Sequence, residues 1–119
     1  MLTPYEIAQE AVKALDSKKA GEIKVLETRD LTVLADYFVI CTASTATHIK
    51  TLSDEVEKAL AQLGENALRT EGQRSGGWVL VDFGCVVIHI FLDEARKFYN
   101  LEHLWSDAPE KDIAALIAQ

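Results

Sequence analysis

The sequence predicts a single α/β (α+β) domain in which helices flank a mixed β-sheet of about five strands. Three features indicate this fold class: a Val- and Ile-rich run over 78–91, an apolar segment at 37–42, and two stretches with apolar residues at helical spacing. The chain has 119 residues, which is the length of one domain with a substantial core. We therefore expect residues 1–119 to form one domain.

Residues 78–91 are expected to fold back on themselves as a β-hairpin. Branching at Cβ makes Val and Ile suit strands, and Asp82-Phe83-Gly84 interrupts the run. Glycine takes a positive φ at little cost, so a loop of about three residues is predicted. Because strand residues alternate, we expect one face to carry Trp78, Leu80, Ile88 and Ile90 and the other Val79, Val81, Val87, His89 and Phe91. Both faces are apolar, so each needs a cover, either helices of the chain or a partner.

The other elements follow from capping residues and periodicity. Thr3, Pro4 and Glu6 are typical of a helix start, and Gly21 of the stop that follows. The further expected elements are strands at 22–29, 37–42 and 66–71, a helix from a cap at Ser44 to Leu63, a turn at 72–77 with a solvated Arg74, a helix at 93–99 continued over 101–105, and a short C-terminal helix within 108–119 that Pro109 begins.

The charge balance indicates the kind of partner. The chain carries 19 acidic and 12 basic residues, a net charge of −7, and its longest basic stretch is Lys18-Lys19. A phosphate backbone repels such a protein, so direct, sequence-specific nucleic-acid binding is not expected. A basic protein surface is the better electrostatic match.

Composition also bears on the compartment. No apolar run approaches the ~20 residues of a membrane span, and the first residues do not resemble a signal peptide, so we expect no membrane contact and a cytoplasmic location. Cys41 and Cys85 are expected to be small buried thiols under reducing conditions, because their spacing does not suit a zinc site.

Candidate catalytic and metal-ligating residues do not form a convincing set. The turn at Ser44 follows a strand and precedes a helix, but it lacks the glycines of a phosphate cradle, so it is interpreted as a plain helix cap. Asp36, Asp82 and His89 do not show the paired spacing of metal-binding carboxylates, and His89 is interpreted as a hydrogen-bonded core residue. We expect no enzymatic activity, no cofactor and no metal.

A group of aromatic residues and an arginine lies in or just after the hairpin. Trp, Tyr and Arg are the residue types enriched at the energetic centre of protein interfaces. The alternative is that these side chains attach the last helices to the sheet, and the sequence leaves both readings open. The members of the group are Trp78, Arg96, Phe98, Tyr99 and Trp105.

Five segments carry a resemblance to a known family: 35–44, 71–72, 77–84, 87–91 and 96–105. Read in order, from Ala35-Asp-Tyr-Phe-Val to Asn100-Leu-Glu-His-Leu-Trp105, they resemble the Iojap-type ribosomal silencing factor family over roughly residues 3–107. The chain departs from the family at Ala43, where glycine is frequent, and the last dozen residues lie outside the resemblance.

The resemblance implies a nucleotidyltransferase-like fold without the catalytic acids and without enzymatic activity. It implies binding to the large ribosomal subunit through its protein number fourteen, which keeps the small subunit away when nutrients are short. Placed on this sequence, the expected partner-binding residues are Trp78, Leu80, Arg96, Tyr99, Leu101 and Trp105. Two alternatives remain: a nucleotide-binding or nucleotidyltransferase-like enzyme, suggested by fold analogy, and a homodimer that covers its own apolar face.

Overall fold

The structure is a computed structural model that describes residues 2–72 and 77–117. Residues 73–76 of the expected turn, Arg74 among them, lie outside the described residues. The elements in chain order are α1 (Pro4–Ser17), β1 (Gly21–Glu27), β2 (Tyr37–Ala43), α2 (Ala46–Ala61), β3 (Arg69–Glu71), β4 (Trp78–Asp82), β5 (Val86–Leu92), α3 (Asp93–Tyr99), α4 (Leu101–Leu104), β6 (Glu110–Lys111) and a 3-10 turn η1 (Ala114–Leu116).

One mixed sheet organises the molecule. Its strand order is β3-β4-β5-β2-β1-β6, and within the described residues only the central pair β2 and β5 is parallel. A parallel pair needs a long crossover connection, which α2, β3 and β4 provide here. The α+β fold with a mixed sheet of about five strands is therefore confirmed, with the two-residue β6 as an addition at one edge.

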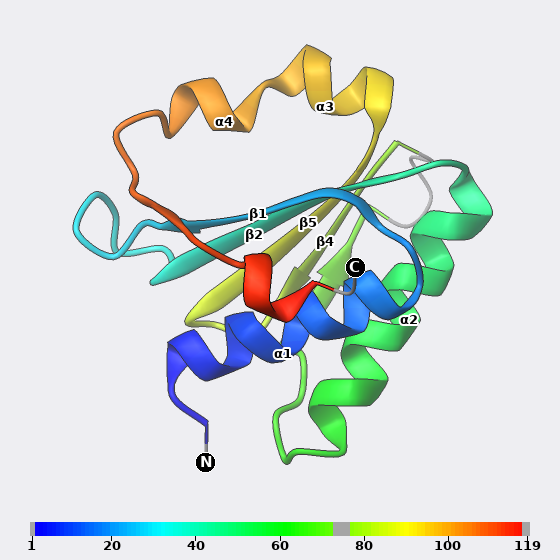
Figure 1. The fold of residues 1–119 in the computed structure, drawn as a ribbon, viewed down its shortest axis with the longest axis horizontal. Coiled ribbons are helices and arrows are strands. Elements are labelled where there is room, and N and C mark those ends of the chain that lie inside the picture. Colours follow the sequence, from blue (N-terminus) through cyan, green and yellow to red (C-terminus); the bar gives the residue numbers. More distant parts are fainter. Residues whose placement is uncertain (1, 73–76, 118–119) are drawn as a thin grey trace.

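Helices lie on both sides of the sheet, as Figure 1 shows: α1 and α2 on one side, α3 and α4 on the other. We call the side under α1 and α2 the closed face and the side under α3 and α4 the open face. The closed face holds the larger buried cluster, in which Leu15 and Leu52 of the helices meet Val39 and Ile88 of the strands. The open face holds a smaller buried cluster around Phe38. Half-buried side chains pack against the border of this cluster.

The two long helices begin at capping residues. The Thr3 hydroxyl accepts a hydrogen bond from the Glu6 backbone N–H, and the Glu6 carboxylate accepts one from the Thr3 backbone N–H, so the predicted capping box is confirmed. The cap of α2 is Thr45, not Ser44 as expected, because the Thr45 hydroxyl accepts from the His48 N–H. The helix starts one residue later than predicted, since the Ser44 N–H is held by the His48 ring instead.

The hairpin forms as predicted, but the assignment of its faces was wrong. Gly84 has φ 88°, and the strands are joined by residues 83–85. Trp78 pairs with Phe91 and Leu80 with His89, so even-numbered residues of β4 lie opposite odd-numbered residues of β5. The open face therefore carries Trp78, Leu80, Val87, His89 and Phe91, and the closed face carries Val79, Val81, Ile88 and Ile90. Loop length sets this register, and the sequence pattern does not reveal it.

The expected C-terminal helix after Pro109 was also wrong. Residues Glu110–Lys111 pair with Val25 and Leu26 as β6, and the Glu27 N–H donates to the Pro109 carbonyl at 2.8 Å. The edge of β1 thus satisfies its backbone groups by pairing with β6, which outweighs the local helical pattern. Only the 3-10 turn at Ala114–Leu116 remains of the expected helix.

Candidate functional site

The open face carries a cluster of aromatic rings where β4, β5 and α3 meet. The Trp78 ring lies 5.0 Å from Phe91 and 4.7 Å from Tyr99, measured between ring centroids. Trp78 Nε1 donates to His89 Nδ1 at 3.2 Å, which fixes the orientation of the indole. Tyr99 remains 50% exposed. The structure thus brings together two residues that lie 21 positions apart in the sequence and that we expected in one binding surface.

A groove of about 410 Å³ lies beside this cluster, between the β3 edge and α3. Its walls are mostly apolar, and one carboxylate stands at its rim, that of Glu71, 3.3 Å from Arg69 Nε. The lining residues are Glu71, Gly72, Gly77, Trp78, Leu80, Ala95 and Tyr99. Gly72 is required here, because a Cβ at that position would lie 2.2 Å from the Trp78 carbonyl oxygen.

The remaining expected residues of this surface lie further along the open face. Trp105 packs edge-on against Phe38, with ring centroids 5.3 Å apart and planes at 90°. Leu80 and Leu101 are half-buried against the same cluster. We refer to Trp78, Leu80, Tyr99, Leu101 and Trp105 as the aromatic surface, since these five lie at the boundary between the open-face core and solvent.

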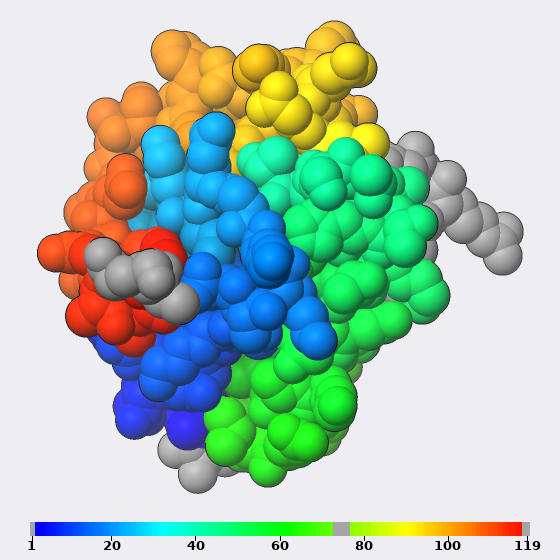
Figure 2. Space-filling model, turned by 45° about the vertical axis from the view of Figure 1, so that its right-hand side comes forward, coloured from blue at the N-terminus to red at the C-terminus, as the bar shows by residue number. Residues whose placement is uncertain are grey.

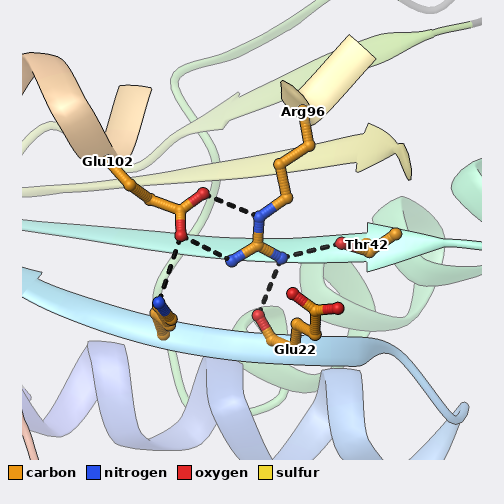
Figure 3. Close-up of polar contacts among 5 residues, drawn as sticks. Glu22, Thr42, Arg96 and Glu102 are labelled. Carbon is orange, nitrogen blue, oxygen red and sulfur yellow. Dashed lines mark hydrogen bonds and ion pairs between the residues drawn. The ribbon is translucent and has the colours of Figure 1, made fainter. Parts of the chain in front are cut away.

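Arg96 is different, because it is buried. Its exposure is 6%, and its guanidinium lies beneath α3 rather than on the surface. It donates to both carboxylate oxygens of Glu102, to the Glu22 carbonyl and to the Thr42 hydroxyl, as Figure 3 shows. Hydrogen bonding from Arg96 holds the pKa of Glu102 below its ordinary value. The structure gives the guanidinium these partners inside the protein.

His89 is buried at the centre of the open face, with 4% exposure. Burial lowers its pKa from 6.5 to about 4, so the ring is neutral at physiological pH. Since Nδ1 accepts from Trp78, the proton of the neutral ring is on Nε2. That nitrogen has no hydrogen-bond partner among the described residues. His89 supports the indole of Trp78 rather than facing solvent.

Two exposed apolar residues extend the aromatic surface outward and were left out of the expected binding set. Phe98 is 81% exposed and Leu104 is 71% exposed, on the outer side of α3 and α4. Figure 2 shows these helices, in yellow and orange, as a ridge along the top of the molecule. Phe98 belonged to the aromatic group seen in the sequence; Leu104 had no signal, because its exposure depends on how α4 is placed.

A second cavity, of about 940 Å³, lies where β2 and β5 end and α2 and α3 begin. Lys18 and Lys19 line it together with Asp93 and Glu94, so its charges are mixed. Within the described residues, no three side chains of His, Cys, Asp or Glu are grouped as metal ligands. The described helices include none long and apolar enough to cross a membrane.

The cysteines lie apart from both cavities. Cys41 is fully buried, and burial raises the pKa of its thiol to about 12, as expected for an inert core residue. Cys85 lies in the hairpin loop and is only half-buried, which corrects the expectation that both thiols are buried.

Fold and site together define a small α+β domain with one partly uncovered aromatic sheet face. The family model described as "Ribosomal silencing factor during starvation" matches residues 2–119. "Ribosomal silencing factor RsfS" of Halalkalibacterium halodurans is 36% identical over 117 residues, which cover 98% of this chain and 100% of the relative. "Protein Iojap, chloroplastic" of Arabidopsis thaliana is 34% identical over 106 residues, which cover 89% of this chain and 44% of the relative.

A solved structure is similar as well. The crystal structure of a Chromobacterium violaceum protein has a TM-score of 0.86 and 34% identity, and the match covers 95% of this chain and 93% of that chain. The chain belongs to the ribosomal silencing factor family, so the resemblance found in its sequence is confirmed. The expectation that the last dozen residues lie outside it was wrong, because the family match continues to residue 119. That family is not known for enzymatic activity.

Proposed function

We propose that the aromatic surface docks on the large ribosomal subunit through its protein number fourteen, in the cytoplasm. The bound domain then occupies space that the small subunit needs, and translation is repressed when nutrients are limiting. The observation that supports this most directly is the half-buried Trp78–Tyr99 pair beside an open groove, in a chain that belongs to a ribosomal silencing factor family.

Charge and size support the same proposal. The net charge of −7 suits a basic ribosomal protein and not bare RNA. A specific interface covers about 800 Å² of each partner, and a few Trp, Tyr and Arg side chains commonly supply most of its free energy. Blocking is steric in this proposal, so no catalytic residue, cofactor or metal is needed.

The test is sedimentation of the protein with separated large subunits. We expect the parent chain to sediment with them, the Tyr99→Ala variant to do so poorly, and Lys50→Ala, an exposed residue of α2, to behave as the parent. A second measurement adds small subunits and follows subunit joining by light scattering. A parent chain that stays in the supernatant, or that binds without slowing subunit joining, would contradict the proposal.

The nucleotide-binding alternative rests on the cavity at the ends of β2 and β5. Its paired lysines and paired acids leave no excess positive charge for a phosphate group, and the turn before α2 offers Ala43 where a cradle requires glycine. Titration with nucleoside triphosphates and Mg²⁺ distinguishes the two functions. Saturable, tight binding would favour the enzyme.

Self-association is a separate outcome that the same surface allows. Two copies that covered each other's open face would hide Trp78 and Tyr99 from the ribosome. Light scattering of the protein alone and with large subunits separates the cases, because a competing homodimer dissociates as subunits are added.

A further inference from the structure

The bend between α3 and α4 lies in the middle of the aromatic surface, although the two helices are short. The two helices have seven and four residues and are joined at Asn100, which has φ 48° in the left-handed region. Helices this short are not stable by themselves in water, and no side chain of the described residues caps either N-terminus. The position of α4 therefore depends on side-chain contacts with the rest of the protein, and not on the hydrogen bonds of its own backbone.

Arg96 and Glu102 provide those contacts from the two sides of the bend. Arg96 Nε lies 2.8 Å from Glu102 Oε1, and Nη2 lies 3.3 Å from Oε2, a two-point contact between α3 and α4. Lys24 of β1 is a second cation at this carboxylate and adds a third contact, with Nζ 3.2 Å from Glu102 Oε2. The carboxylate thus ties α4 both to α3 and to the sheet.

The second terminal nitrogen of Arg96 fixes the bend to the sheet. Nη1 donates to the Glu22 carbonyl at 2.8 Å and to the Thr42 hydroxyl at 2.7 Å, on β1 and β2. Four of the five guanidinium N–H groups can therefore be assigned to partners on three elements. A buried charge requires such partners, and here they also define a single position for the guanidinium.

The bend separates the residues of the aromatic surface. Tyr99 lies immediately before Asn100, and Leu101 and Trp105 follow it. A shift of α3 by one ångström at this point would move the Tyr99 ring away from Trp78, to which it is now packed at 4.7 Å. The geometry of the surface thus depends on a network whose central residue, Arg96, is buried beneath α3.

We propose that Arg96 is a positioning residue, which, with Glu102, fixes the bend between α3 and α4 and so holds Tyr99 against Trp78 in the arrangement that the partner binds. This inference rests on the proposed function, because it concerns the same surface. It also replaces the direct contact that the sequence suggested for Arg96 with an indirect role.

Lysine cannot take the same role. A lysine ammonium has three donors at one point, whereas the guanidinium presents two parallel N–H groups to the carboxylate and further ones to Glu22 and Thr42. We therefore expect Arg96→Lys to keep the charge and lose the position of the bend.

The test is a double-mutant cycle on the affinity for large subunits, with Arg96→Gln and Arg96→Lys each made in the parent and in Tyr99→Ala. In the parent background we expect either change to weaken binding about tenfold. In the Tyr99→Ala background we expect less than about a twofold further loss, because the ring that Arg96 positions is already absent.

Glu102→Gln should weaken binding in the parent and much less in the Tyr99→Ala background, as the Arg96 variants do. Arg29→Gln, which removes an exposed arginine paired with Glu27, is the matched control and should bind as the parent does.

Equal losses in both backgrounds would mean that Arg96 contacts the partner directly, and the proposal would be overturned. Unchanged affinity of Arg96→Gln and Arg96→Lys in the parent would overturn it too. Amide hydrogen exchange of the free variants provides a reading that does not depend on the ribosome. We expect faster exchange confined to residues 97–105, while α1 and α2 keep their protection.

The two proposals fail in different ways. If the parent chain does not bind large subunits, the proposed function is wrong, and the exchange measurement alone decides whether Arg96 fixes the bend. If the parent binds and exchange at 97–105 does not change in Arg96→Gln, the positioning role is wrong and the proposed function stands. Should Arg96→Gln fail to fold, Glu102→Gln leaves the buried guanidinium hydrogen-bonded to Thr42 and Glu22 and supplies the second test.

Discussion

The closed and open faces of the sheet are built from similar strand residues but are covered to different extents. On the closed face, α1 and α2 with 14 and 16 residues leave Val39, Val81 and Ile88 without exposure. On the open face, α3 and α4 with seven and four residues leave Trp78 and Leu80 of β4 only half-buried. The length of the covering helices, and not the strand composition, therefore distinguishes the fully buried face from the partly exposed one.

The two faces also differ in what they bury. The closed side buries the small hydroxyl of Ser53 on α2 beside its apolar cluster, whereas the open face encloses His89 and the Arg96 guanidinium. Burying polar groups lowers stability unless they are hydrogen-bonded, but hydrogen bonds have a preferred geometry and apolar contacts do not. The open face therefore trades some stability for fixed side-chain positions, which is what a binding surface requires.

The largest expected effect belongs to the closed face. Leu52→Ala removes a side chain with 0% exposure beneath β5, and the cavity should lower the free energy of unfolding by about 2–5 kcal/mol. Urea unfolding measures this change. The folded variant should bind large subunits as the parent does, since the aromatic surface lies on the other side of the sheet. A loss of affinity in the folded variant would remove the separation between the two faces.

The next effect belongs to the open face and has the opposite signature. Tyr99→Ala should weaken binding by about 2–4 kcal/mol, as the loss of a central anchor does, and change the free energy of unfolding by less than about 1 kcal/mol because the residue is half exposed. Trp78→Ala should weaken binding similarly and also lower stability, because its ring packs on Phe91. Melting temperature and affinity are measured on each variant. A variant that melts far lower but binds as tightly as the parent while folded does not belong to the aromatic surface.

The hairpin shows which features of the two faces can be predicted from the sequence. Local patterns predict the strand at 37–42, the hairpin over 78–91 and its loop at Gly84, and the structure confirms them with bounds that extend one residue further, to Ala43 and Leu92. They do not predict the pairing of Trp78 with Phe91, because one residue more or less in the loop reverses every face. Residue types therefore predicted the elements but not which side chains share a face.

The sequence suggested residues for the candidate site by their chemistry, and their role in binding stays a prediction, whereas the geometry of the site could not be read from the sequence. The aromatic side chains in or just after the hairpin, Trp78, Tyr99 and Trp105 among them, were suggested by chemistry alone. The burial of Arg96 depends on Glu22, Thr42 and Glu102, which are 74, 54 and 6 positions away along the chain, and no local pattern links them. β6 was missed for the same reason, since two residues give no periodicity to detect.

Acid should destabilise the open face through His89. The folded-state pKa of about 4 lies below the 6.5 of the unfolded chain, so the unfolded chain takes up the proton first as pH falls. The contribution of neutral His89 to the free energy of unfolding is complete above pH 6.5 and is lost as the pH falls toward 4. Between pH 7 and pH 5 the free energy of unfolding should decrease by about 2 kcal/mol. Urea unfolding of the parent and of His89→Phe at both pH values measures the difference. His103→Gln, an exposed residue of α4, is the control and should behave as the parent. Equal pH dependence in His89→Phe and the parent would contradict the prediction.

The smallest effect concerns salt, and it separates the faces by charge rather than by packing. Exposed charges are screened beyond about 8 Å at physiological ionic strength, so association with a basic partner should slow a few-fold between low and physiological salt, while dissociation changes little. Stopped-flow association with large subunits measures both rates.

Glu71→Gln removes a carboxylate at the rim of the groove and should flatten the salt dependence of the association rate. Glu10→Gln makes the same change on α1, beside the closed face, and should leave it as in the parent. If both variants flatten it equally, the net charge of the whole protein guides association and the groove has no special part in it. An association rate of the parent that is independent of salt would remove the electrostatic contribution and leave the apolar contacts of Trp78 and Tyr99 as the source of affinity.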